Sequence, residues 1–186
     1  MGRIGLGLTA CLVVLAGCAR PEALSVAAPE ASSPAKLAPQ IPLPLDVSSY
    51  ADAPCTLLKP GTTVAKDMAK GVADGATCTW TAKTPLQPQI TVTVDLKSGG
   101  LEALYRKRAR LPYFEPTDIA GYPAVHTDTD RSVPDQGQCT VNVGMNDVTL
   151  ITVTSTIADQ RSLNFAVPCP DTDVFATALV SEITKG

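Results

Sequence analysis

The sequence predicts an α+β domain, built on a mainly antiparallel sheet of about six strands with helices packed on one face. The clearest strand is 89–96, where apolar and polar residues alternate, so that one face is buried and the other is wet. Helical spacing of apolar residues appears at 101–109 and again after Asp171. Between these helical segments, β-rich stretches follow one another with turn residues between them, as in antiparallel sheets.

The N-terminal residues 1–17 are typical of a lipoprotein signal peptide. Arg3 supplies a positive charge, and residues 4–16 are almost wholly apolar but too few to span a bilayer, which needs ~20 apolar residues. Two small residues then precede Cys18, an order that predicts cleavage before this cysteine and lipid attachment to its thiol. Two or three acyl chains give stable anchoring, so we expect a protein held at the extracytoplasmic face of the cell membrane.

Residues 18–47 are predicted to form an extended tether. Proline recurs there among alanine and serine, and such a segment buries too little apolar surface to fold. Ser33 and Lys36 match the S-x-x-K pattern of penicillin-binding enzymes, but that chemistry requires the lysine one helical turn from the serine, which a proline-rich coil does not provide. A single domain is expected over residues 48–186.

Charge excludes one class of partner. The chain of 186 residues has a formal net charge of −3 and a pI near 5.1, which argues against nucleic acid as a partner. After residue 17, no stretch is long and apolar enough to cross a membrane.

The first part of the predicted domain contains short elements. Residues 54–58 begin with proline and resemble a short helix entry. Residues 60–70 form a weak helix that ends at Gly71, residues 73–75 form a turn, and residues 78–81 form a strand.

The predicted helix over 101–109 places Leu101, Leu104 and Tyr105 inward, and Pro112 ends it. Its last part carries the basic cluster, which consists of Arg106, Lys107, Arg108 and Arg110. One interpretation is contact with anionic lipid headgroups or an acidic partner. The other is a solvated helix end that complements the helix dipole, which the acidic body of the protein favours.

The second half of the domain is predicted to contain four strands and a final helix. The strands cover residues 114–119, 122–127, 139–143 and 148–157. Turns at 120–121 and 144–147 join them in pairs. Asp171 and Asp173 fit the first turn of the final helix. Its inward face is predicted to hold Phe175, Ala178, Leu179 and Ile183.

The cysteines of the predicted domain indicate disulfides. Cys11 lies in the signal peptide, which leaves four cysteines after Cys18. They are Cys55, Cys78, Cys139 and Cys169. An even number in an exported protein favours disulfides, and their spacing does not choose among the three possible connectivities. A zinc site is the weaker alternative, because the chain has no C-x-x-C pair and one histidine.

His126, Asp128 and Asp130 are the candidate binding residues. They occupy alternate positions, so a continuing strand would point all three the same way, ~6.6 Å apart. An imidazole and two carboxylates could bind a divalent metal, although a polar strand end is the simpler explanation and we assign no metal. Because binding residues concentrate on loops, the polar segment 126–138 is the predicted partner site.

Several short motifs together resemble a known family. Their order is a lipobox and Pro/Ala tether, then 54–58, 78–80 and 121–125, then Cys139 and Cys169. This order is similar to the actinobacterial lipoproteins grouped as domain of unknown function 3558. The resemblance implies an envelope-anchored α+β domain and favours the sequential pairing, Cys55 with Cys78 and Cys139 with Cys169. It implies no catalytic residues.

The sequence favours a non-enzymatic binding or accessory module of the cell envelope, with an envelope protein as its partner. The nucleophile elbow G-x-S-x-G is absent, and no motif indicates a cofactor. The alternative is a carrier of an apolar small molecule or lipid, which requires a pocket. Such a pocket would be lined by Ile90, Val92, Leu104 and Phe175. A hydrolase of envelope polymers is a weaker third candidate.

Overall fold

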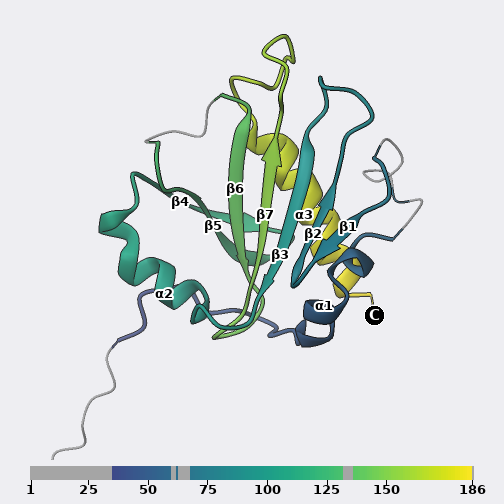
Figure 1. The fold of residues 1–186 in the computed structure, drawn as a ribbon. Helices are drawn as coiled ribbons and strands as arrows, with labels where there is room; N and C mark the ends of the chain where they lie inside the picture. Colours follow the sequence, from purple (N-terminus) through teal and green to yellow (C-terminus); the bar gives the residue numbers. More distant parts are fainter. Residues whose placement is uncertain (1–34, 60–61, 63–67, 132–135, 186) are drawn as a thin grey trace, which may run out of the picture. The chain divides into compact units, whose positions relative to one another are not determined.

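A seven-stranded antiparallel sheet forms the centre of the protein (Figure 1). The structure is a computed structural model and describes residues 35–59, 62, 68–131 and 136–185. The strand order is β1-β2-β3-β7-β6-β5-β4. The strands are β1 (Val72–Asp74), β2 (Thr77–Trp80), β3 (Gln89–Asp95), β4 (Tyr113–Ile119), β5 (Tyr122–Asp128), β6 (Gln138–Gly144) and β7 (Leu150–Thr156).

The helical elements lie before, within and after the strands. They are α1 (Ser48–Asp52), the 3₁₀ turn η1 (Pro54–Leu57), α2 (Gly100–Lys107), the 3₁₀ turn η2 (Arg108–Arg110) and α3 (Cys169–Ile183). α2 connects β3 to β4 at the far edge of the sheet, and the chain then returns through β5, β6 and β7 until β7 pairs with β3. This confirms an α+β fold with an antiparallel sheet, with one strand more than predicted. Among the described residues, no helix combines the length and apolar character of a membrane span.

The larger core lies on the sheet face that α3 covers. Ile90, Val92 and Val94 alternate along β3 and are 0–3% exposed, as the period of two predicted. Phe175 and Leu179 of α3 are buried in the same cluster, and α3 lies behind the strands in Figure 1. Of the predicted inward residues of α3, Ala178 is only half-buried, and the buried face is completed by Thr172, Ala176 and Val180.

α2 packs on the other face of the sheet, so the expectation that all helices share one face is wrong. Leu101 and Tyr105 form a separate cluster with Val125 and Leu150. Successive strand residues point to opposite faces, and Val125 follows Ala124, which belongs to the larger core. The crossover from β3 to β4 carries enough apolar residues to cover this second face in part.

Threonine occupies much of the second face away from α2. Hydroxyl groups pair across neighbouring strands, Thr77 with Thr93 at 2.9 Å and Thr140 with Thr154 at 2.9 Å. These side chains are half-buried. β-branched threonine suits a strand that is wet on one side, which accounts for the polar half of the alternation in 89–96.

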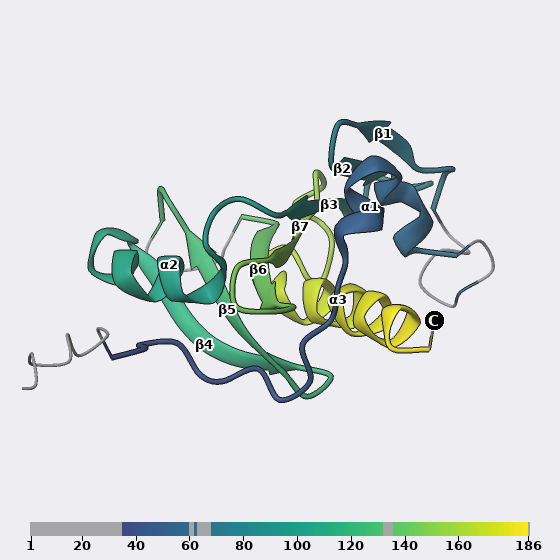
Figure 2. The ribbon, with the colours of Figure 1, turned by 90° about the horizontal axis from the view of Figure 1, so that it is seen from below.

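The packed unit begins before the predicted boundary at Ser48. Its start lies at Ala35, and Ile41 and Val47 are buried in the larger core. We call residues 35–47 the strap. In Figures 1 and 2 the strap runs from α2 to α1. Proline-rich composition favoured an extended tether here, and the strap is without helix or strand. Its Ile41 and Val47 are nevertheless buried, while Leu37 and Leu43 are exposed.

Of two predicted elements of the first part, one lies mostly outside the described residues and the other differs from the structure. The weak helix over 60–70 falls mostly outside the described residues, and Met68 forms an isolated bridge with Ala82. The predicted turn at 73–75 overlaps β1, which pairs with β2 over Val72–Asp74. This strand is exposed at all three positions, so it lacks the apolar alternation from which strands are recognised.

Candidate functional site

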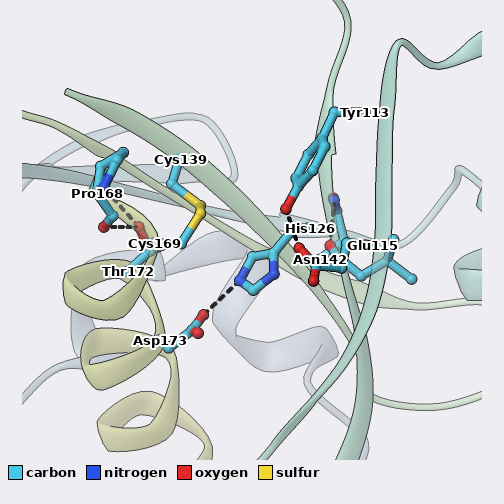
Figure 3. A network of polar contacts seen from close by, with 11 residues as sticks. Tyr113, Glu115, His126, Cys139, Asn142, Pro168, Cys169, Thr172 and Asp173 are labelled. Carbon is cyan, nitrogen blue, oxygen red and sulfur yellow. Dashed lines mark hydrogen bonds and ion pairs between the residues drawn. A yellow bond between two sulfur atoms is a disulfide. The ribbon is translucent and has the colours of Figure 1, made fainter. Parts of the chain in front are cut away.

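His126 occupies a buried position on β5, beside the first turn of α3. Its neighbours across the sheet are Glu115 on β4 and Val141 on β6, and the residue is 6% exposed. The Nε2 atom lies 2.8 Å from Oδ1 of Asp173 on α3, as Figure 3 shows. A buried imidazole requires such a partner, because an unpaired polar group in the core is costly.

Tyr113 and Glu115 lie on β4 on the other side of His126 (Figure 3). The Tyr113 hydroxyl donates a hydrogen bond to Oε2 of Glu115. Partial burial, the hydrogen bond to Glu115 and the negative charges of Glu115 and Asp173 raise the pKa of Tyr113 to about 12. The phenol is therefore protonated at neutral pH. We call these four residues, Tyr113, Glu115, His126 and Asp173, the polar cluster.

A disulfide joins α3, which carries Asp173, to β6, the strand beside β5. Cys139 on β6 and Cys169 at the start of α3 are joined, with their Cα atoms 5.1 Å apart. Cys55 in η1 and Cys78 on β2 form a second disulfide. The structure therefore contains the sequential pairing, which the family resemblance favoured and the spacing left open.

The Cys139–Cys169 disulfide bears directly on metal binding. The sulfur atoms of Cys139 and Cys169 and one ring nitrogen of His126 lie within 4.8 Å of one another. Zinc is held by thiolates, and these two sulfurs are bonded to each other. In this state the three residues do not supply a zinc ligand set.

Two hydroxyl groups near the disulfide are buried in the core and hydrogen-bonded to each other. Ser155 Oγ and Thr172 Oγ1 share a hydrogen bond of 2.5 Å, and both residues are 0% exposed. Thr172 also lies 3.3 Å from the carbonyl oxygen of Pro168. Neither hydroxyl can reach a substrate from the surface, so they support the fold of the α3 start.

Asp128 and Asp130 do not converge with His126. Oδ1 of Asp128 accepts hydrogen bonds from the backbone N–H groups of Asp130 and Arg131. Oδ2 accepts a hydrogen bond of 3.0 Å from Nε of Arg131. Burial opposes the charge of Asp128, but these hydrogen bonds and the guanidinium outweigh it and lower its pKa. Asp130 is exposed beyond the end of β5. Asp128 thus shapes the start of the loop, and part of the predicted partner site, 132–135, lies outside the described residues.

The structure adds three residues to the site that sequence reasoning did not assign. Glu115 pairs with His126 because the turn at 120–121 sets the register of β4 against β5, a signal already present in the sequence. Tyr113 is in the same register, opposite Asp128. Asp173 was predicted only as a first-turn residue of the final helix, and its contact with β5 depends on tertiary packing.

The predicted carrier pocket is not formed by its four residues. Ile90 and Val92 are fully buried in the larger core with Phe175. Leu104 packs against the cluster on the opposite face. Hollows of about 160 and 550 Å³ lie instead between the strap and the β6–β7 turn. Lys36 and Asp147, with side chains 66% and 76% exposed, line both, so these hollows are surface features.

The comparisons with known proteins give a family. The family described as Protein of unknown function (DUF3558) matches residues 13–182. The chain belongs to the DUF3558 family. No curated protein and no solved structure matches it. For this DUF3558 chain, the geometry of the polar cluster is therefore the basis on which a function can be argued.

Proposed function

We propose that this DUF3558 chain is an actinobacterial envelope lipoprotein, held at the extracytoplasmic face of the cell membrane, and that it is a non-enzymatic binding module. The observation that carries the proposal is the polar cluster. It holds a partly buried His126–Asp173 hydrogen bond between β5 and α3 and a tyrosine–glutamate pair on β4. A disulfide joins the start of α3 to the next strand, β6.

The anchor is supported by the sequence. The apolar run at 4–16 ends in two small residues and Cys18, which is the order that lipoprotein processing requires. The family match begins at residue 13 and so includes the end of this apolar run and Cys18.

Charge and exposure indicate the chemistry of the partner. Glu115 is exposed and Asp173 is 33% exposed at its side chain, and both are close enough to Tyr113 to raise its pKa. Two carboxylates and a phenol at one place suit a partner that presents lysine, arginine or another amine, because charge-assisted hydrogen bonds to carboxylates are strong. The net charge of the chain, −3, is also negative and would attract a cationic partner.

Binding is favoured over catalysis by what surrounds His126. A histidine–aspartate pair serves hydrolysis when a serine or cysteine nucleophile lies within reach of the ring. Here the two nearby sulfurs form a disulfide, and the hydroxyls of Ser155 and Thr172 are buried against each other. These contacts support a role for His126 in holding the Asp173 carboxylate in place, rather than a catalytic role.

The anchor is tested at Cys18. Mass spectrometry of the native protein should find an N-terminal Cys18 with attached diacylglycerol. The Cys18→Ala variant should stay uncleaved or leave the membrane. An unmodified Cys18, or a mature protein that begins elsewhere, would refute the anchor.

The binding site is tested by charge neutralisation within intact envelopes. Chemical cross-linking of the native chain should capture a partner. In the Glu115→Gln plus Asp173→Asn variant, the amount of captured partner should fall by at least about 80%, because these two carboxylates supply the charge-assisted bonds. Asp52→Asn plus Asp74→Asn is the control with equal charge loss.

If the Glu115→Gln plus Asp173→Asn variant keeps its thermal transition and still captures the partner, the partner does not bind at the polar cluster. Turnover of an ester or polymer by the purified protein, stopped by a single carboxylate substitution, contradicts a non-enzymatic function.

A further inference from the structure

The tether reaches the packed domain beside α2. The backbone N–H groups of Leu37 and Ala38 donate to Oε2 of Glu102, at 2.8 and 3.0 Å. Lys36, one residue earlier, forms an ion pair of 2.9 Å with Asp147. The described chain therefore starts at the first turn of α2, as Figure 1 shows.

The basic cluster follows directly on this helix. Its four residues, 106, 107, 108 and 110, are all exposed. No acidic residue occurs in the sequence between Glu102 and Glu115. Arg106 forms an ion pair of 2.6 Å with Glu102, one helical turn before it. The cluster is thus a cationic surface on a chain that is acidic overall.

The helix dipole does not account for the whole cluster. Arg106 and Lys107 stand in the last turn of α2 and Arg108 is its C-cap residue. The interaction of charges with the dipole falls off within the last turn. Arg110 lies two residues beyond the cap, in η2, where complementing the dipole gives little reason for a further cation.

Distance favours the membrane as the cluster's partner. At ~3.1 Å per residue for an extended proline-rich chain, the segment from Cys18 to Ala35 reaches about 50 Å at most. At ~1.5 Å per residue, Lys107 is roughly 8 Å along the helix axis from Glu102, where the strap is attached. A lipid at Cys18 therefore keeps the basic cluster at a high effective concentration near the headgroups.

We propose that the basic cluster docks on anionic phospholipid headgroups and so orients the domain on the membrane. The orienting role rests on the proposed lipid anchor. The attraction acts over about 8 Å at physiological ionic strength, so it requires contact rather than proximity. The tether and the cluster are then two adjacent attachments of the same side of the domain.

Binding without the anchor is the first test. The mature chain, residues 18–186 with Cys18→Ser, is sedimented with vesicles containing one-third phosphatidylglycerol. We expect binding that falls about tenfold or more in the Lys107→Gln, Arg108→Gln, Arg110→Gln variant, and that weakens with salt. Vesicles of neutral phosphatidylcholine should not bind. The control, Lys70→Gln, Lys83→Gln, Lys185→Gln, loses the same charge elsewhere and should change binding less than about twofold.

Amine labelling of the lipidated native protein is the second test. On phosphatidylglycerol vesicles, acetylation of the Lys107 amine should slow about fivefold or more relative to neutral vesicles, as expected for an amine held against headgroups. Lys70 should label equally on both.

The outcomes separate the two proposals. Headgroup docking is overturned if both triple variants of the Cys18→Ser chain bind equally to phosphatidylglycerol vesicles. It is also overturned if these vesicles do not protect the Lys107 amine from acetylation. Both results hold even if the native Cys18 is lipidated. Binding to an acidic polypeptide but not to the vesicles also overturns it and assigns the cluster to a protein partner. An unmodified native Cys18 refutes the anchor, while the vesicle assay still decides whether the cluster binds lipid.

Discussion

His126 is held in place by a carboxylate that still reaches solvent. The His126 side chain is 7% exposed and that of Asp173 is 33% exposed, so their hydrogen bond runs from the core to the surface. Such a bond can stabilise the fold and also transmit the presence of a bound cation, because a partner that pairs with Asp173 competes with the imidazole for the same carboxylate.

A double-mutant cycle measures this contact. We expect His126→Gln and Asp173→Asn to show a coupling free energy of unfolding of about 1 kcal/mol in urea denaturation. The same cycle on Arg161 and Asp159, whose ion pair includes an arginine 84% exposed, should give a smaller coupling, because solvent screens it. Equal couplings in the two cycles would show that His126 and Asp173 do not act as a buried pair.

Asp128 gives the fold a pH dependence of known sign. Its pKa is lowered in the folded protein, so the ionised carboxylate contributes stability that is present above the unfolded value of ~3.9 and lost as pH falls through the folded pKa. Asp128→Asn should destabilise the protein by about 1 kcal/mol at pH 7, as losing a helix-cap-like bond does. The difference from the native chain should shrink below about pH 4. A difference that persists unchanged at pH 2 would contradict the assignment.

At the scale of elements, the chain that enters β6 is fixed through Gly137. Its N–H donates to the carbonyl oxygen of Phe165, and its own carbonyl accepts the N–H of Ile157, both at 2.7 Å. The φ angle is +74°, and a Cβ there would lie 2.4 Å from the Ile157 oxygen. This glycine therefore aligns the end of the loop with β7, two residues before Cys139.

Alanine substitution at two glycines separates the cost of a positive φ angle from the cost of a steric clash. Gly75 also has a positive φ, +56°, but no atom lies within 4 Å of its Cβ position. We expect Gly75→Ala to lower the free energy of unfolding by about 1 kcal/mol, and Gly137→Ala by about 2–3 kcal/mol because a main-chain clash is added. Thermal denaturation of the two variants checks the order. Equal losses would contradict the close approach at Gly137.

Sequence periodicity predicted the elements that have one wet face. β3, β6 and β7 alternate between apolar and polar residues over most of their length, and α3 has an apolar stripe. It did not predict β1, which is exposed on both faces, nor the packing of α2, because a short amphipathic helix fits either face of a sheet. Of the predicted binding residues, His126 belongs to the polar cluster, whereas Asp128 and Asp130 do not. The His126 ring is joined to Asp173 across 47 positions of sequence, and no local pattern specifies that contact.

At the scale of the whole molecule, the strap connects the proposed anchor to the sheet. Ile41 and Val47 bring the end of the tether into the core, and Leu45 exchanges hydrogen bonds with the β6–β7 turn at Met145 and Asn146. The strap thus fixes the point at which the proposed anchor would be attached to the domain. Two disulfides join η1 to β2 and β6 to α3, which suits the proposed role of presenting a fixed surface.

The central proposal is that a partner binds at the polar cluster. A photoreactive phenylalanine analogue is placed at Val174, which follows Asp173 on α3 and is 57% exposed, or, separately, at Thr79 on the second face, and intact cells are irradiated. Both carboxylates of the polar cluster stay in place, so we expect a covalent adduct from position 174 and none from position 79. Adducts from position 79 alone, or equal adducts from both positions, would contradict the proposal.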